Sequence, residues 1–387
     1  MKPSVLTLCH LADLHLGYRR FGKVTAQGFN QREVDVNQAF HEALERIAAL
    51  DPAILLIPGD VFHAVRPSNA VLAFAFRELR HFTAQTKCPV VISSGNHESP
   101  RRSDSGSALR LLAEIENVHV ADTKPERFCF PDADLSVLCL PHPSLVDLSG
   151  LQLRADDRYK FNVLCVHAQI GSRWVSDYGG ANLRLADLAP HEWDYIALGH
   201  VHAREELAVN ACYSGSIEHT STDFWQEQDR RKGFLEVELP GARAVFHALS
   251  SPREVVQLSS LEALGRSPDE VMQALAERID SVPGGIEGKI VRIEVRGISR
   301  EAQRLLDYRL MRKWRSSALN LTIDFKVAPR DLPEARRAGA RGSMEDEFES
   351  FCRNWQPQGV ELSEVQESIR KFLGKIESFD EASKSQA

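Results

Sequence analysis

Residues 4–15 read SVLTLCHLADLH, an apolar run typical of a buried β-strand that ends in Asp13 and His15. Four later segments have the same design. They are AILLIPGD (53–60), PVVISSGNHE (89–98), FNVLCVH (161–167) and YIALGHVH (195–202). Each strand-like run ends in carboxylate, amide or imidazole side chains, which bind metal ions. Because ligands bind at the carboxyl ends of strands in open α/β sheets, we expect these five ends to converge.

Three segments between these runs have the apolar spacing of helices, at 33–50, 68–86 and 103–116. Ser68 and Ser103 are suited to cap two of them. Strands that alternate with helices predict a layered α/β fold. Four short strand-like segments then complete the first domain: ACYSGSI (211–217), GFLEVEL (233–239), RAVFHAL (243–249) and EVVQL (254–258).

The pattern changes after this first domain, which we place at residues 1–258. Residues 259–330 combine strands KIVRIEV and LNLTIDFKV with two helical patterns, one at 299–317, and predict a small α+β domain. Residues 331–344 are rich in Pro, Gly, Ala and Arg, as a linker would be. Residues 345–387 hold two amphipathic patterns and predict a C-terminal helical tail.

Composition narrows the class of protein. The chain has 387 residues, 43% of them hydrophobic, which is more than one core usually contains. The first residues lack a secretory signal and no apolar run approaches the length of a membrane span, so we expect a soluble cytoplasmic protein with no membrane partner. The seven cysteines are scattered without a CxxC pair, which indicates buried thiols in a reducing compartment.

The net charge of −7 is not typical of a non-specific DNA-binding surface, but the charge is unevenly distributed. Residues 343–387 carry ten acidic and five basic side chains, which leaves 44 acidic and 42 basic ones elsewhere. Four local basic groups lie in this nearly neutral remainder. They are Arg19, Arg20 and Lys23; Arg101 and Arg102; Arg230, Arg231 and Lys232; and Arg336, Arg337 and Arg341. Each group is either a solvated cluster or a set of phosphate contacts.

The residues at the strand ends make a complete ligand set for two metal ions. If Asp60 bridges the ions, seven residues supply eight bonds, four for each ion; they are Asp13, His15, Asp60, Asn96, His167, His200 and His202. Oxygen and imidazole ligands without a thiolate suit Mn²⁺ and tolerate Fe or Zn. Two-metal sites activate water for attack at phosphorus, so a phosphodiester is the expected substrate. His97, next to Asn96, would then protonate the leaving group or stabilise the transition state.

The order DLHLG, GDVFH, GNHE, a single His and GHVH resembles the calcineurin-like metallophosphoesterases. Within them, the chain is most similar to the nuclease subunit of the bacterial SbcCD complex and to its archaeal and eukaryotic meiotic-recombination counterparts. GDVFHAVRPS (59–68), YSGSIEHT (213–220) and KGFLEVEL (232–239) add to the resemblance. Matching motifs occur throughout residues 5–240, whereas beyond them only the order of the structural elements is similar.

The resemblance implies a layered β-sandwich core flanked by helices, with the small α+β domain as a cap that grips duplex DNA. One ion would be held by Asp13, His15, Asp60 and His202, and the other by Asp60, Asn96, His167 and His200. His97 and His63 would be the catalytic pair. His10 matches no ligand position of the family and is expected to be structural.

The resemblance also implies a Mn²⁺-dependent exonuclease and endonuclease for double-strand ends and single-stranded DNA in double-strand-break repair. Its partners would be an SMC-like ATPase of the SbcC type and a second copy of this chain, on the nucleoid. The tail would dock on the ATPase through apolar anchors, which are Phe348, Phe351, Trp355, Ile369, Phe372 and Leu373. The helix at 68–86 is unusually apolar; Phe74 and Phe76 make either a dimer contact or ordinary core packing.

One residue departs from the family pattern. Glu98 stands where the family usually has Asp, and because Glu is one methylene longer, the support of His97 is in doubt. GNHE is typical of protein Ser/Thr phosphatases, although the other motifs here differ from theirs. Two alternatives therefore stay open: another dinuclear phosphoesterase, with a small phosphodiester or phosphoprotein substrate, or mainly a scaffold that tethers DNA ends.

Overall fold

The structure is a computed structural model that describes residues 4–99, 106–146, 150–171, 182–227 and 230–327. The contacts of the described residues up to Lys326 group them into one compact unit. No helix in the described ranges has both the length and the apolar character that crossing a membrane requires.

Several sequence predictions lie outside the described residues. They are the linker at 331–344, the tail at 345–387 with its anchors Phe348, Phe351, Trp355, Ile369, Phe372 and Leu373, the cap residue Ser103, and the basic residues Arg101, Arg102, Arg336, Arg337 and Arg341.

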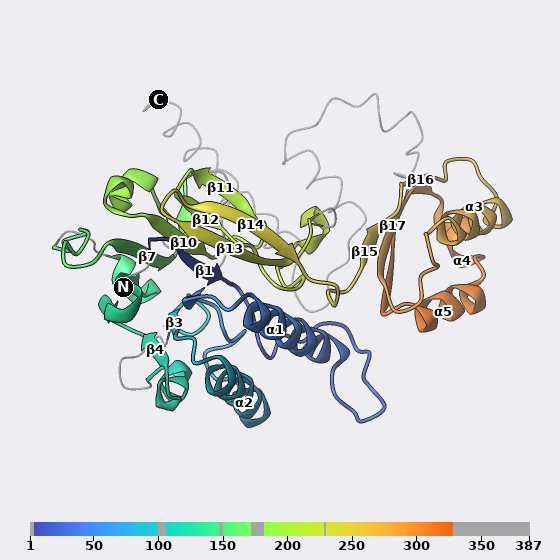
Figure 1. Cartoon of the computed structure of the whole chain (residues 1–387). Helices are drawn as coiled ribbons and strands as arrows, with labels where there is room; N and C mark the ends of the chain where they lie inside the picture. Colours follow the sequence, from blue (N-terminus) through green and yellow to red (C-terminus); the bar gives the residue numbers. More distant parts are fainter. Residues whose placement is uncertain (1–3, 100–105, 147–149, 172–181, 228–229, 328–387) are drawn as a thin grey trace, which may run out of the picture. The chain divides into compact units, whose positions relative to one another are not determined.

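The first sheet has six strands in the order β14-β13-β1-β2-β3-β4 (Figure 1). Their bounds are β1 Leu6–His10, β2 Ile54–Pro58, β3 Val90–Ser93, β4 Val118–Ala121, β13 Gly233–Leu239 and β14 Arg243–Ala248. Strands β1 to β4 are parallel, while β13 and β14 add antiparallel to the β1 edge. The parallel strands bring the ends of the first three predicted runs to one edge.

The second sheet also has six strands, in the order β11-β12-β10-β7-β6-β5. Their bounds are β5 Glu126–Phe130, β6 Leu135–Leu140, β7 Phe161–His167, β10 Tyr195–Gly199, β11 Glu205–Ala208 and β12 Ala211–Tyr213. β6, whose six residues are all buried, was not among the predicted strands. A separate two-stranded ladder joins β8 Gln169–Ile170 and β9 Asn182–Leu183.

Side chains of the first sheet alternate between two cores. Leu8 and Leu56 point toward the second sheet and pack with Val163, whereas Cys9 and Leu55 point to the opposite face. Helices α1 Gln31–Leu50 and α2 Asn69–Thr86 and the 3-10 helix η1 Ala108–Glu114 cover that face (Figure 1). Burying each large apolar side chain contributes about 1.5–3 kcal/mol. The predicted layered β-sandwich flanked by helices is confirmed.

Local signals explain where the helices begin. Asn30 accepts a hydrogen bond from the N–H of Arg32 at the start of α1, and Ser68 caps α2 as predicted. The third predicted helix is the short η1. On α2, Phe74 and Phe76 are half-buried against the core of their own chain, so intramolecular packing accounts for part of the extra apolar surface.

A third sheet follows, built from β15 Val255–Gln257, β16 Leu261–Glu262, β17 Ile290–Ile298 and β18 Asn320–Val327. Helices α3 Pro268–Asp280, α4 Arg300–Arg304 and α5 Tyr308–Ser317 pack on it around Leu275, Ile293 and Met311. This is the predicted α+β unit, and its role as a cap stays a prediction.

Two details of this third sheet differ from the sequence analysis. The segment EVVQL was expected to complete the first domain, but its strand β15 pairs in parallel with β17. The helix expected at 299–317 is divided into α4 and α5. Asp307 causes the break, because its side chain accepts hydrogen bonds from the N–H groups of Arg309 and Leu310 and starts a new helix.

The remaining 3-10 helices are η2 Pro131–Ala133, η3 His142–Val146, η4 Leu185–Leu188, η5 Pro190–Glu192 and η6 Phe224–Glu227.

Candidate metal centre

All seven predicted ligands converge at the carboxyl ends of β1, β2, β3, β7 and β10. Four of them have left-handed backbone conformations, with φ of 54° at Asp13, 50° at His15, 52° at Asp60 and 101° at His200. Non-glycine residues rarely adopt such angles, and surrounding contacts must maintain them. These turns direct the four side chains toward the region beside the carboxyl ends of the strands.

Glycine precedes three of the ligands, and each glycine is required by a close approach. An added Cβ at Gly59 would lie 2.4 Å from His167 Nδ1, and one at Gly95 would lie 2.1 Å from Asp60 Oδ1. At Gly199 it would lie 1.8 Å from the carbonyl oxygen of Pro58. Because glycine has no Cβ, these three positions let their loops approach neighbouring atoms more closely than any other residue would allow.

The first predicted ligand group is assembled around His15. Its Nε2 lies 3.0 Å from His202 Nε2 and 3.6 Å from Asp60 Oδ2. Ligand atoms of Asp13, His15 and His202 all lie within 4.8 Å of one another. The carboxylate of Asp13 also accepts hydrogen bonds from the N–H of His200, at 3.0 and 3.1 Å.

The second group is assembled around Asn96. Its Oδ1 lies 2.9 Å from His167 Nε2 and 3.1 Å from His200 Nδ1. His167 Nε2 lies 3.4 Å from Asp60 Oδ2, the oxygen that also faces His15. The other oxygen of Asp60 accepts a hydrogen bond from the N–H of His97 at 3.0 Å. The Asp60 carboxylate is therefore fixed with one oxygen toward both groups, as a bridging ligand requires.

The donor atoms fit a bound cation. His167 Nδ1 lies 2.8 Å from the carbonyl oxygen of Pro58, which can only accept, so Nδ1 carries a proton. In the neutral ring, the lone pair of Nε2 then faces the oxygens of Asn96 and Asp60. Lone pairs that face one another repel unless a cation lies between them. These residues therefore fit the divalent metal pair that dinuclear phosphoesterases use.

The pKa shifts of the buried groups also indicate a site for cations. Burial lowers the pKa of His167, but the carboxylates of Asp60 and Asp13 outweigh it and raise that pKa to about 10. Burial raises the pKa of Asp13 to about 7, although the His167 imidazolium opposes the shift. Two buried carboxylates are costly without positive charge beside them. The centre therefore attracts cations, whether protons or metal ions.

His97 and His63 lie together at the same edge. His97 Nδ1 donates a hydrogen bond to the carbonyl oxygen of His63 at 2.7 Å, and the two ring centroids are 5.2 Å apart. Burial, followed by the neighbouring His97, lowers the pKa of His63 to about 4. Both rings line a cleft of about 580 Å³ together with His15, Asp60, Asn96 and His200. The sequence-predicted catalytic pair thus faces the candidate metal ligands.

Glu98 has a different role from the one that the sequence analysis considered. Its buried carboxylate accepts hydrogen bonds from the backbone N–H groups of Asp60, Phe62 and Gly95. The side chain therefore joins the loops after β2 and β3. Burial, together with the nearby Asp60 carboxylate, raises the pKa of Glu98 to about 8.

Two further residues have clear structural roles. His10 is buried, with Nδ1 2.9 Å from the hydroxyl of Tyr195 in the second sheet, which fits the structural role expected for it. Lys232 was grouped with exposed basic residues, but it is 3% exposed. Its Nζ donates to the carbonyl oxygen of His202 at 2.8 Å and to Glu227 at 2.6 Å. Nothing in its local sequence indicated this burial.

The candidate ligands lie in a stretch of sequence that matches a known protein family. Residues 6–204 match the family described as calcineurin-like phosphoesterase. The chain is 28% identical over 240 residues to the DNA double-strand break repair protein Mre11 of Methanocaldococcus jannaschii, covering 60% of this chain and 62% of that protein.

Two other relatives are similar at comparable levels. Mre11 of Methanopyrus kandleri is 25% identical over 295 residues, covering 70% of this chain and 63% of the relative. The D component of the nuclease SbcCD of Bacillus subtilis is 24% identical over 248 residues, covering 54% of this chain and 61% of the relative. The chain thus spans a little less than two thirds of the length of these relatives.

Proposed function

The chain belongs to the calcineurin-like phosphoesterase family, and we propose that it is a metal-dependent nuclease that hydrolyses phosphodiester bonds at DNA ends in double-strand-break repair. The observation that carries the proposal is the position of Asp60 Oδ2, 3.6 Å from His15 Nε2 and 3.4 Å from His167 Nε2. One carboxylate oxygen facing two ligand groups is the arrangement of a two-metal hydrolase. The names of the similar archaeal and bacterial proteins support DNA as the substrate.

Two divalent ions, with Mn²⁺ preferred, would supply Lewis acidity that activates water and stabilises charge on the phosphoryl oxygens. Asp13, His15, Asp60 and His202 would hold one ion, and Asp60, Asn96, His167 and His200 the other. The hydrogen bond from the N–H of His97 to Asp60 Oδ1 keeps Oδ2 directed toward both positions. The His167 ring is oriented by its bond to Pro58, which leaves Nε2 as the ligand atom.

His97 would act on the substrate from the side of the cleft. Its Nδ1–H is held by the carbonyl oxygen of His63, so the ring orientation is set before substrate binds. A positioned imidazole can stabilise the developing charge or deliver a proton to the leaving oxygen. His63, whose ring meets that of Tyr18 edge-on with centroids 5.0 Å apart, would assist from the same wall.

We also propose partners for the chain, on the basis of its resemblance to the SbcCD nuclease subunit. The proposed complex contains an SMC-like ATPase of the SbcC type, two copies of this chain, and DNA with double-strand ends or single strands. The third sheet with α3 to α5 would be the DNA cap, and residues 345–387 would bind the ATPase. The site of action would be the nucleoid in the cytoplasm.

The proposal is tested by incubating the purified chain with end-labelled linear duplex DNA in Mn²⁺, Mg²⁺ or EDTA. We expect degradation that depends on Mn²⁺ and stops in EDTA. The matched variant is His97→Ala, which removes the ring while leaving all seven predicted ligands in place. It should retain bound metal and lose most of the cleavage.

Absence of DNA cleavage, together with hydrolysis of a simple phosphodiester, would contradict the proposal and favour a different phosphoesterase. Cleavage that is equal in the wild-type chain and His97→Ala would contradict the assigned role of His97.

A further inference from the structure

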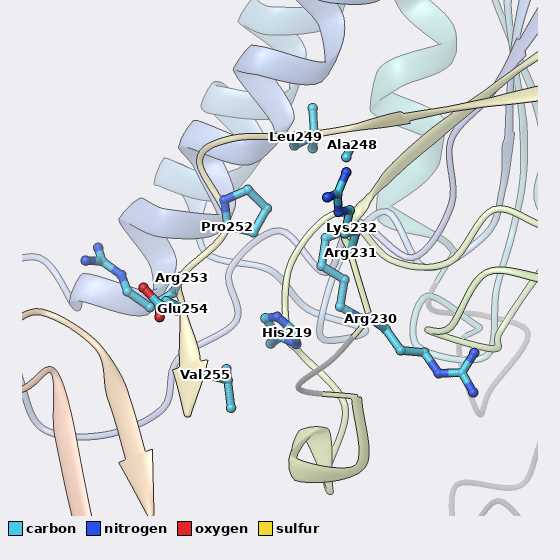
Figure 2. A pocket seen from close by; sticks show the side chains of 10 residues that line it. All are labelled: His219, Arg230, Arg231, Lys232, Ala248, Leu249, Pro252, Arg253, Glu254 and Val255. Atoms are coloured by element: carbon cyan, nitrogen blue, oxygen red, sulfur yellow. The ribbon is translucent and has the colours of Figure 1, made fainter. Parts of the chain in front are cut away.

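A second cavity of about 530 Å³ shares Arg230 with the metal cleft. Its polar lining residues are His219, Arg230, Arg231, Lys232, Arg253 and Glu254 (Figure 2). We call it the hinge pocket, because it lies where β14 leads into β15. Figure 2 shows the Arg230 side chain extending away from the other labelled residues.

The cations of the hinge pocket differ in whether a carboxylate already neutralises them. Lys232 pairs with Glu227 at 2.6 Å, and Arg253 pairs with the buried Asp35. Arg230 and Arg231 are both exposed, and neither has an acidic partner within the part of the chain that the structure describes. The uncompensated positive charge of the pocket therefore resides on these two neighbouring arginines.

The wall behind these arginines is held by a buried ionic network. Arg32 on α1 is 1% exposed and pairs with Asp35 at 2.9 Å and with Glu218 at 3.1 Å. The other oxygen of Glu218 accepts a hydrogen bond from the N–H of Arg253 at 2.7 Å. Arg32 also donates to the carbonyl oxygen of His219 at 2.9 Å. The pocket is thus built on residues fixed by charge-assisted bonds, which preorganises it for a ligand.

The chemistry of the pocket fits the phosphates of a nucleic acid strand. A strand bound at the metal centre continues to carry one negative charge about every 3.4 Å along its axis. A cavity of this volume holds a group of small-molecule size, such as one nucleotide of a single strand. Guanidinium groups bind phosphate oxygens in a bidentate manner. Arg230 lines both cavities, so a strand that contacts it at the metal cleft lies next to the hinge pocket.

We propose that the hinge pocket is a phosphate subsite for a single DNA strand that runs past the metal centre, with Arg231 as its phosphate ligand. The inference rests on the proposed nuclease function and deepens it. A strand that contacts both cavities gains a phosphate contact that a small phosphodiester bound at the metal centre lacks.

The test measures binding of a fluorescein-labelled single-stranded oligonucleotide to the full chain by anisotropy, in EDTA and over a range of salt concentrations. Arg231→Glu should weaken binding on the order of three- to tenfold and reduce the slope of log affinity against log salt by about one. The control is Arg154→Glu, an exposed arginine that lines neither cavity. It should bind as the wild type does.

Hydrolysis of bis(p-nitrophenyl) phosphate in Mn²⁺ separates a subsite from a damaged centre. Arg231→Glu and the milder Arg231→Gln should hydrolyse this minimal substrate at the wild-type rate, which also shows that they fold. Unchanged oligonucleotide affinity and salt slope in both variants would overturn the subsite, as would an equal loss on both substrates. DNA cleavage by the wild-type chain, measured in parallel, tests the proposed function separately.

Discussion

The carboxylate of Glu98 accepts a hydrogen bond from the backbone N–H of Asp60, with 3.2 Å between the two atoms. The same carboxylate binds the N–H groups of Gly95, at 2.9 Å, and Phe62, at 2.7 Å. These bonds tie the loop that carries the predicted bridging ligand to the loop that carries Asn96. The residue at position 98 therefore acts on the metal centre through the backbone.

Replacing Glu98 by Ala should lower the free energy of unfolding by about 2–5 kcal/mol, because three buried N–H donors lose their acceptor. Urea unfolding measures the loss. The control is Glu45→Ala on α1, whose side chain is 70% exposed and should change stability by less than about 0.5 kcal/mol. Equal effects of the two substitutions would contradict the structural role of Glu98.

Gly95→Ala should weaken Mn²⁺ binding at least about tenfold, because the new methyl group would lie 2.1 Å from Asp60 Oδ1 and must displace that carboxylate. Isothermal titration calorimetry measures the affinity. Gly22→Ala is the matched control, since no atom lies within 4 Å of its Cβ position. Equal Mn²⁺ affinity of the two variants would show that the methyl group does not displace the Asp60 carboxylate.

Asp60→Asn should retain fewer than two metal ions per chain after gel filtration, as measured by mass spectrometry of the metals. The amide keeps an oxygen that can accept from the N–H of His97, but it removes the negative charge that faces both ligand groups. Folding should be preserved, as circular dichroism would show. Retention of two tightly bound ions would rule out Asp60 as the bridge.

His63→Ala should lower kcat on DNA by roughly ten- to a hundredfold without changing the metal content. The loss should be smaller than for His97→Ala, because the bond that orients His97 comes from the backbone carbonyl of residue 63 and survives the substitution. Steady-state kinetics beside metal analysis make the comparison. A larger loss in His63→Ala would reverse the assignment of the principal catalytic residue.

Glu42 on α1 should stabilise the fold in a manner that depends on pH. Burial raises its pKa, but hydrogen bonds from Ser251 and Ser250 outweigh it and lower the pKa from 4.5 to about 2. Because the folded state prefers the ionised carboxylate, the stabilisation is present above pH 4.5 and is lost as the pH falls toward 2.

The comparison is between wild type and Glu42→Gln in urea at several pH values. The variant should be less stable by about 1–3 kcal/mol near neutral pH, and the difference should shrink below the ordinary pKa of glutamate. A difference that is constant with pH would show that the bonds to Ser250 and Ser251 do not depend on the charge.

The sequence by itself determined the layered architecture and which residues meet at the strand ends. Both follow from local features: an apolar run makes a strand, and the glycine and ligand that follow it make a tight turn. The turns at Gly59, Gly95 and Gly199 each place the next side chain at the end of a strand, in the first sheet for Asp60 and Asn96 and in the second sheet for His200. The packing of the two sheets then brings these strand ends together. No long-range information was needed to name Asp60, Asn96 and His200.

Only the tertiary structure decided what surrounds these side chains. Lys232 looks like its exposed neighbours Arg230 and Arg231 in sequence, yet it is buried against the carbonyl oxygen of His202 because a distant loop folds over it. The Glu98 carboxylate accepts hydrogen bonds from N–H groups in two different loops, and β15 pairs with β17 of the third sheet. Both likewise depend on segments that lie apart in the chain. Propensity and spacing describe neighbours in sequence, whereas burial and charge pairing arise from neighbours in space.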